Sequence, residues 1–205
     1  MRPMPPAAPV IRRFAPRTVL AMGFILARPA GRVASRGSRH GRIHRMDDPE
    51  VRLVRMTDAE VAAWLPGAMA HYEQARREAG DTPEQAAAGR RASEERFFPG
   101  GRPVEGQLLH SIRLGDEDAG WLWLGPWDEH GELWWVWDLE VHPSFRRRGV
   151  ARRAMLAGEE VAREHGASRL GLNVFGYNDG AIALYRDLGY EVASLHMAKA
   201  LRTDR

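Results

Sequence analysis

The sequence contains no cysteine among its 205 residues, and it contains no long apolar run. Without cysteine, the chain can form neither disulfides nor thiolate metal sites, and it has no cysteine nucleophile. A membrane-spanning helix needs about 20 apolar residues, and the short apolar run at residues 18–27 is too short for one. With 44% hydrophobic and 28% charged residues, the composition is that of an ordinary globular protein. We expect no membrane partner and no metal.

Acidic residues are missing from the first 45 positions, which contain ten arginines. Residues 46–205 therefore carry 20 basic and 27 acidic residues, a net charge of −7, although the whole chain sums to +3. A net negative domain argues against nucleic-acid binding as its main role. A nucleic-acid binder is an alternative that rests on residues 1–45 alone.

The same 45 residues are rich in Pro, Gly, Arg and Ala and show neither a helical nor a strand period. We expect them to be a disordered or mis-assigned leader, with a functional start near Met46. Arg12-Arg13-Phe14, which precedes the apolar run, leaves an export signal as the alternative. In both cases we expect one folded domain over residues 46–205.

Periodicity and turn residues predict the elements of that domain. A capping box at Thr57 and Glu60 indicates a helix start, and we expect Pro66-Gly67 to interrupt this helix. Two glycine-rich turns predict an antiparallel meander, and the later strand–helix–strand order predicts parallel pairing. We therefore expect an α/β fold of the α+β type, with a mixed, mostly antiparallel central sheet flanked by helices. The expected strands are residues 51–55, 107–114, 121–124, 132–142, 169–175 and 190–201, and the expected helices are 58–65, 68–79, 83–97, 150–165 and 179–188.

Six of the seven tryptophans lie between Trp121 and Trp137. Trp121 and Trp123 share one strand face, as do Trp135 and Trp137. This pattern is typical of an aromatic core patch across neighbouring strands. The alternative is that some of these rings line a substrate site and contact a cationic amine.

An arginine cluster lies where a strand ends and a helix begins, in the run from Val141 to Arg153. The positive end of the helix dipole disfavours cations at this position. Exposed first-turn amides and arginine side chains together form a site for phosphate or pyrophosphate. The alternative is a solvated basic helix end.

Two segments resemble the signatures of the GNAT superfamily of N-acetyltransferases. Residues 146–151, Arg-Arg-Arg-Gly-Val-Ala, fit its acyl-CoA signature Gln/Arg-x-x-Gly-x-Gly/Ala. Residues 173–178, followed by Ala181 to Tyr185 and Leu188 to Tyr190, look like its second signature. The element order over about residues 51–201 is also similar. The resemblance implies a GNAT-like fold and acetyl-CoA as co-substrate.

Carried to this chain, the resemblance implies that the backbone of residues 139–141 bonds the pantetheine arm like an added strand. The amides of about residues 147–152 would bind the pyrophosphate, with Gly149 allowing close approach. Arg147 replaces a frequent glycine, so its side chain either faces solvent or contacts the 3′-phosphate. Asn178 bonds the pantetheine arm or simply caps the last helix. The implied acyl-CoA residues are Leu139, Glu140, Val141, Arg146, Arg147, Arg148, Gly149, Val150, Ala151, Arg152, Asn173, Asn178 and Tyr185.

The resemblance also implies that Tyr185 is the general acid, since a phenol can donate a proton to a departing thiolate. Packing on the inner helix face is the alternative role for Tyr185. Some relatives have a glutamate where this chain has Asn173, and an asparagine cannot act as a base. Glu140 is therefore our candidate base, with Asp138 on the same strand as a substitute and Glu73 as a more distant one.

These inferences predict a cytoplasmic N-acetyltransferase that transfers an acetyl group directly to a primary amine in a ternary complex. The acceptor is a small molecule, a protein N-terminus or a lysine. A non-catalytic acyl-CoA-binding or regulatory module is the alternative, because Asn173 replaces a carboxylate. A homodimer is left open, because homodimers are common in the family.

Overall fold

The computed structural model describes residues 49–195, 197 and 199, so the predicted leader lies outside its description. The elements follow one another in this order: β1 (Val51–Arg55), α1 (Asp58–Glu78), α2 (Pro83–Phe97), a 3-10 turn (Pro99–Gly101), β2 (Leu108–Leu114), β3 (Glu117–Pro126), β4 (Leu133–Val141), a second 3-10 turn (Pro143–Phe145), α3 (Val150–Glu164), β5 (Arg169–Leu172) and α4 (Asp179–Asp187).

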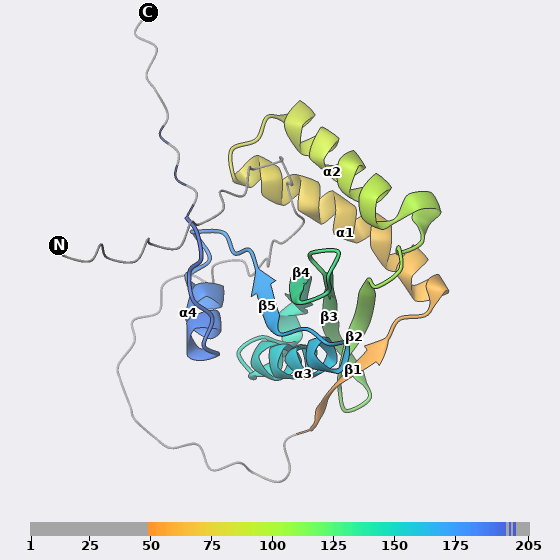
Figure 1. Ribbon diagram of the computed structural model, residues 1–205, viewed down its shortest axis with the longest axis vertical. Helices are drawn as coiled ribbons and strands as arrows, with labels where there is room; N and C mark the ends of the chain where they lie inside the picture. Colours follow the sequence, from red (N-terminus) through yellow and green to blue (C-terminus); the bar gives the residue numbers. More distant parts are fainter. Residues whose placement is uncertain (1–48, 196, 198, 200–205) are drawn as a thin grey trace, which may run out of the picture.

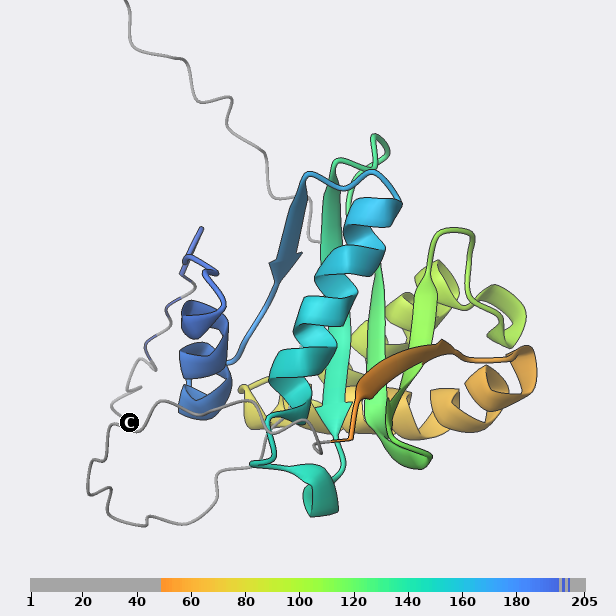
Figure 2. The same ribbon diagram turned by 90° about the horizontal axis from the view of Figure 1, so that it is seen from below.

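The five strands form one sheet in the order β1-β2-β3-β4-β5. Each neighbouring pair is antiparallel except β4 and β5, which are parallel. The parallel pair arises because α3 carries the chain back along the sheet between these two strands. Figures 1 and 2 show α3 on one face of the sheet and α1 and α2 on the other. The predicted mixed, mostly antiparallel sheet flanked by helices is confirmed.

Each face of the sheet buries its own hydrophobic core. On the α3 face, Leu122 and Leu124 pack with Met155 of the helix. On the α1–α2 face, Trp123 and Trp137 are 0% and 1% exposed, and they contribute an aromatic core patch as the tryptophan pattern predicted. Burial of one such side chain stabilises the fold by roughly 1.5–3 kcal/mol.

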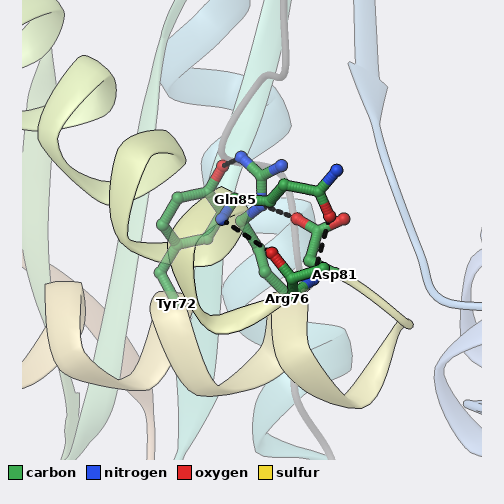
Figure 3. Close-up of polar contacts among 5 residues, drawn as sticks. Tyr72, Arg76, Asp81 and Gln85 are labelled. Atoms are coloured by element: carbon green, nitrogen blue, oxygen red, sulfur yellow. Dashed lines mark hydrogen bonds and ion pairs between the residues drawn. The ribbon is translucent and has the colours of Figure 1, made fainter.

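Two capping boxes and a buried arginine hold the α1–α2 hairpin together. Thr57 caps α1 with Glu60, and Thr82 caps α2 with Gln85. Figure 3 shows the guanidinium of Arg76 between the Tyr72 hydroxyl and the Asp81 carboxylate. Arg76 is only 4% exposed, and its charge is compensated by the ion pair with Asp81.

The predicted interruption at Pro66 is wrong, because α1 runs unbroken from Asp58 to Glu78 with Pro66 inside it. An internal proline removes one helical hydrogen bond and costs about 3 kcal/mol. Val61 and Met69 lie on either side of the proline, and both are buried in the same core. Their shared burial holds the two halves of the helix in line.

Two predicted strands have other limits. β3 begins at Glu117 rather than Trp121, because residues 115–116 alone form the turn that joins Leu114 to Glu117. β5 ends at Leu172 rather than Phe175. The register of β3 with β4 shifts between Trp123 and Leu124, beside Val136, where the pairing of β4 with β5 also ends.

The predicted strand over residues 190–201 is wrong in its described part. Residues 190–195, 197 and 199 are irregular. Tyr190 bonds to the helices instead, through its hydroxyl to Glu159 at 3.2 Å and its amide to the carbonyl of Tyr185 at 2.9 Å. Residues 196, 198, 200 and 201 lie outside the described residues.

Candidate active site

The C-terminal part of β4 lacks a neighbouring strand on one side. The last β4–β5 pair joins Val136 to Leu172, so residues 137–141 extend beyond the end of β5. The His142 amide donates to the carbonyl of Ala119 on β3 at 2.9 Å. Because peptide groups alternate along a strand, those of Leu139 and Val141 point to the side where β5 has ended. This edge can accept an extended ligand as an added strand.

A basic, glycine-containing turn leads from this edge to α3. Gly149 precedes α3 with φ +73, a conformation that glycine adopts without strain. The helical bonds begin with the Arg153 amide, which donates to the carbonyl of Gly149 at 3.2 Å. The amides of Val150, Ala151 and Arg152 are therefore left for another partner, and the first turn of α3 contains no acidic residue.

The arginine side chains around this turn make different contacts. Arg148 lies over the Phe145 ring at 5.3 Å. Arg152 donates to the carbonyl of Asp187 at 3.4 Å, and Arg153 donates to that of Pro49 at 3.1 Å. Arg147 is exposed and has φ +61, a left-handed conformation that is strained for a residue with a side chain. The predicted phosphate loop is thus an exposed basic turn with open amides.

Arg146 turns back from this loop to the end of β4. Its Nε donates to the carbonyl of Val141 at 2.9 Å, and its Nη2 donates to Glu140 Oε1 at 2.6 Å. Glu140 is only 8% exposed. Burial raises the pKa of Glu140, and Arg146, His71 and His142 oppose that rise. The predicted base is therefore the partner of a cation, an arrangement that favours its ionised form.

Asp138, two residues earlier on β4, accepts a hydrogen bond from a neutral side chain. The Trp121 indole Nε1 donates to Asp138 Oδ2 at 2.7 Å. Burial raises the pKa of Asp138, the bond from Trp121 lowers it, the nearby Glu140 carboxylate raises it and the bond from the Leu139 amide lowers it, and the net value is about 7. This value is suited to a group that must lose and regain a proton near neutral pH.

Tyr185 projects from α4 into the α3-side core and is 3% exposed. Its hydroxyl is buried and has no hydrogen-bond partner among the described residues. Burial, Tyr190 and Asp138 all raise the pKa of Tyr185, so the phenol retains its proton. The Tyr190 ring packs edge-on against it, with centroids 5.8 Å apart. A buried, unbonded hydroxyl close enough to Asp138 to sense its charge is a candidate proton donor.

The asparagines predicted for the site occupy different environments. Asn178 is 4% exposed and caps α4, accepting a bond from the Ala181 amide at 3.2 Å. The capping role is therefore confirmed. Asn173 is exposed in the segment that follows β5. Glu73 accepts bonds from Arg77 and Arg90 on the α1–α2 hairpin, which makes it the least suitable base of the three carboxylates.

The sequence favoured Glu140 over Asp138 as the general base, because a sequence pattern does not show which hydrogen-bond donors contact each carboxylate. Because side chains alternate between the two faces of a strand, Asp138 and Glu140 are expected on the same face of β4, and both lie on one face. The bond from Trp121 depends on the register of β3 with β4, in which Trp121 lies opposite Glu140 and Trp123 opposite Asp138. The bulge beside Trp123 sets that register, and no residue pattern indicated it.

Within the described residues, no group of three or more histidine and acidic side chains is arranged to bind a metal ion. In residues 49–195, none of the helices combines the length and apolar character that crossing a membrane requires.

The fold and site are those of an acyltransferase, and comparisons with known proteins identify its family. Residues 54–190 match the model of the acetyltransferase (GNAT) family. The uncharacterized N-acetyltransferase YycN of Bacillus subtilis is 29% identical over 154 residues, 74% of this chain and 99% of that protein. A crystal structure of YycN superposes with a TM-score of 0.68 at 27% identity, covering 75% of this chain and 99% of that one. The chain belongs to the GNAT family of acetyltransferases.

Two other relatives are named for the same reaction. The uncharacterized N-acetyltransferase YdgE of Bacillus subtilis is 34% identical over 110 residues, 52% of this chain and 69% of that protein. The thialysine N-epsilon-acetyltransferase of Caenorhabditis elegans is 33% identical over 99 residues, 43% of this chain and 58% of that protein. The chain is therefore an acetyltransferase enzyme, in a family that uses acetyl-CoA as donor and amines as acceptors.

Proposed function

We propose that this enzyme transfers the acetyl group of acetyl-CoA directly to an aliphatic primary amine, at the point where β4 extends beyond β5. The observation that carries the proposal is the position of three groups around that point. The open peptide edge of β4 is followed by the basic turn before α3, and the buried Tyr185 hydroxyl lies close enough to Asp138 of the same strand to sense its charge. When bound, acetyl-CoA supplies the thioester that the amine attacks and the sulfur that departs.

The donor side of the site binds an extended ligand with a charged end. The Leu139 peptide group and the Val141 amide bond the pantetheine arm as an added strand would, since the Val141 carbonyl already accepts a bond from Arg146. The amides of Val150, Ala151 and Arg152 bind the pyrophosphate, with Arg147 and Arg148 providing positive charge. The sequence predicted that residues 139–141 all bond the pantetheine arm. The peptide group of Glu140 points toward β3, so only Leu139 and Val141 remain for this contact.

Tyr185 is the general acid in this proposal. Its raised pKa keeps the phenol protonated at neutral pH, and its hydroxyl has no competing bond among the described residues. The phenol donates its proton to the departing sulfur, which would otherwise leave as a free thiolate.

Asp138 is the general base, and Glu140 is not. A base must be ionised when the amine arrives and must then accept a proton, directly or through one water. Arg146 stabilises the ionised form of Glu140 and so opposes the rise in its pKa that burial causes. Asp138 has a pKa of about 7, and its bonded partner is a neutral indole, so it can accept and release a proton near neutral pH.

The acceptor class follows from the chemistry of the α1–α2 face. Two carboxylates, Asp138 and Glu140, lie beside the ring of Trp121 on this face, and carboxylates and aromatic rings both favour an ammonium group. The name of the thialysine relative supports an amine at the end of an aliphatic chain. A small molecule of this kind, a lysine side chain or a protein N-terminus each presents such an amine.

Replacement of Tyr185 tests the proposal at one atom. In Tyr185→Phe, we expect amine-dependent release of CoA from acetyl-CoA to fall about 100-fold, because a positioned acid contributes about that much. Binding of CoA, measured by calorimetry, should change less than about twofold, since the hydroxyl acts on the departing sulfur. Tyr177→Phe is the matched control, because that ring is 45% exposed, and it should retain full activity. Equal activity in Tyr185→Phe and the wild type would contradict the assigned role.

A further inference from the structure

Trp121 has a different environment from the tryptophans of the core. It is only partly buried, near the middle of β3, and it lies opposite Glu140 in the register with β4. Its indole Nε1 reaches diagonally to the next carboxylate on that face and donates to Asp138 Oδ2 at 2.7 Å. The indole nitrogens of Trp64, Trp135 and Trp137 are buried and have no partner within the described part of the chain.

The Trp121 ring is fixed from two sides. Trp64 of α1 packs edge-on against it, with centroids 6.3 Å apart and an interplanar angle of 74°. His142, directly after β4, packs against it with centroids 5.7 Å apart at 70°. A ring held between a helix and the end of a strand cannot turn freely about its side-chain bonds. The direction of its N–H is therefore set by the fold, and it points at Asp138.

The bond to Trp121 restricts the carboxylate in turn. Asp138 Oδ2 is occupied by the indole, which fixes the plane of the carboxylate and leaves its other oxygen for a second partner. The remaining groups around Asp138 come from several elements. Glu140 of β4 acts against its ionised form, the Leu139 amide favours that form, and Tyr185 of α4 is close enough to sense its charge. His71, His142 and Arg146 act on Glu140.

We propose that Trp121 is a positioning residue, whose indole N–H orients the Asp138 carboxylate toward the acceptor amine and favours its ionised form. The inference rests on the proposed role of Asp138 as the base. Trp121 itself touches neither the transferred group nor the donor, and it acts through Asp138.

The test removes the N–H and retains a ring. In Trp121→Phe, the carboxylate loses a hydrogen bond to its ionised form, so the pKa of Asp138 should rise above about 7, by about one unit. Carbon-13 NMR titration of the side-chain carboxyl in the full-length chain measures this without any substrate. The acidic limb of kcat/KM for amine-dependent CoA release should move to higher pH by the same amount, with the KM for acetyl-CoA unchanged.

Two matched variants separate the possible outcomes. Trp135→Phe changes another ring whose nitrogen is unbonded and which packs against Trp127 and Trp137, and it should leave both the NMR titration and the pH limb in place. Asp138→Asn should abolish the limb, and adding Trp121→Phe to it should cause no further loss of rate. An unmoved Asp138 titration in Trp121→Phe, or an equal shift in Trp135→Phe, would overturn the positioning role and leave the base intact. A limb that persists in Asp138→Asn would instead overturn the base itself.

Discussion

At the scale of single residues, the site depends on how two similar carboxylates acquire different properties. Asp138 and Glu140 lie on one face of β4, two positions apart, and burial raises the pKa of each. Glu140 is bonded by a guanidinium and Asp138 by an indole. A cation stabilises a carboxylate more strongly than a neutral donor does. In the proposed mechanism, the partner rather than the position along the strand favours Asp138 as the base.

The raised pKa of Asp138 predicts a pH-dependent cost in stability. The folded chain binds this proton up to about pH 7, whereas an unfolded aspartate releases it near 3.8. Folding is therefore opposed increasingly as the pH rises between these two values, and the full cost is present above pH 7. We expect Asp138→Asn to be at least about 1 kcal/mol more stable than the wild type at pH 8, with the difference lost near pH 4.

Urea unfolding at pH 4, 6 and 8 measures this difference. Asp116→Asn serves as the control, because the Asp116 side chain is fully exposed, and it should show no such pH dependence. A wild type that is more stable than Asp138→Asn at pH 8 would mean that the fold stabilises the ionised carboxylate, and the raised pKa of Asp138 would then be wrong.

At the scale of elements, the end of β4 is the feature that organises the site. The bulge in the β3–β4 pairing lies where the pairing of β4 with β5 ends, and the turn before α3, with its open amides, follows this part of β4. The sequence indicated the second of these features through Pro143, the arginine cluster and Gly149. It could not indicate the bulge, because a bulge arises from the register between two strands and has no residue signature of its own here. Pro66 likewise signals a helix break, and only the burial of residues on both sides shows why the helix continues.

The turn before α3 contains a strained residue whose replacement should stabilise it. Arg147 has φ +61, which costs a residue with a side chain about 1–2 kcal/mol. Glycine removes that strain, although the greater conformational entropy of the unfolded chain lowers the free energy of unfolding by about 0.4–1 kcal/mol. We expect the free energy of unfolding of Arg147→Gly to be about 0.5–1 kcal/mol above that of the wild type. Arg148→Gly, which loses the contact with Phe145, should be less stable than the wild type. A loss of stability in Arg147→Gly equal to that in Arg148→Gly would show that strain at Arg147 is not the dominant effect.

At the scale of the whole molecule, the fold class, the family and the element order from α2 to α4 could be predicted from the sequence, since two signatures lie on matching elements. Capping residues such as Thr57, Thr82 and Asn178 marked the helix starts correctly because they act within one turn. The strand predicted over residues 190–201 failed in its described part because its pattern required a partner strand, and Tyr190 bonds to α3 and α4 instead. Local signals were thus sufficient for the fold, and the distinction between Asp138 and Glu140 required contacts distant in sequence.

The proposed function depends above all on direct transfer from thioester to amine within one complex of enzyme, acetyl-CoA and acceptor. Absence of cysteine removes the most nucleophilic side chain for a covalent route. Initial rates of CoA release by the full-length enzyme, over a grid of acetyl-CoA and amine concentrations, test this transfer, with thialysine, lysine and a peptide with a free N-terminus as the amines. We expect release to require an amine and the double-reciprocal lines to intersect. Parallel lines, or acetyl-CoA binding without amine-dependent release for any of these acceptors, would contradict direct transfer.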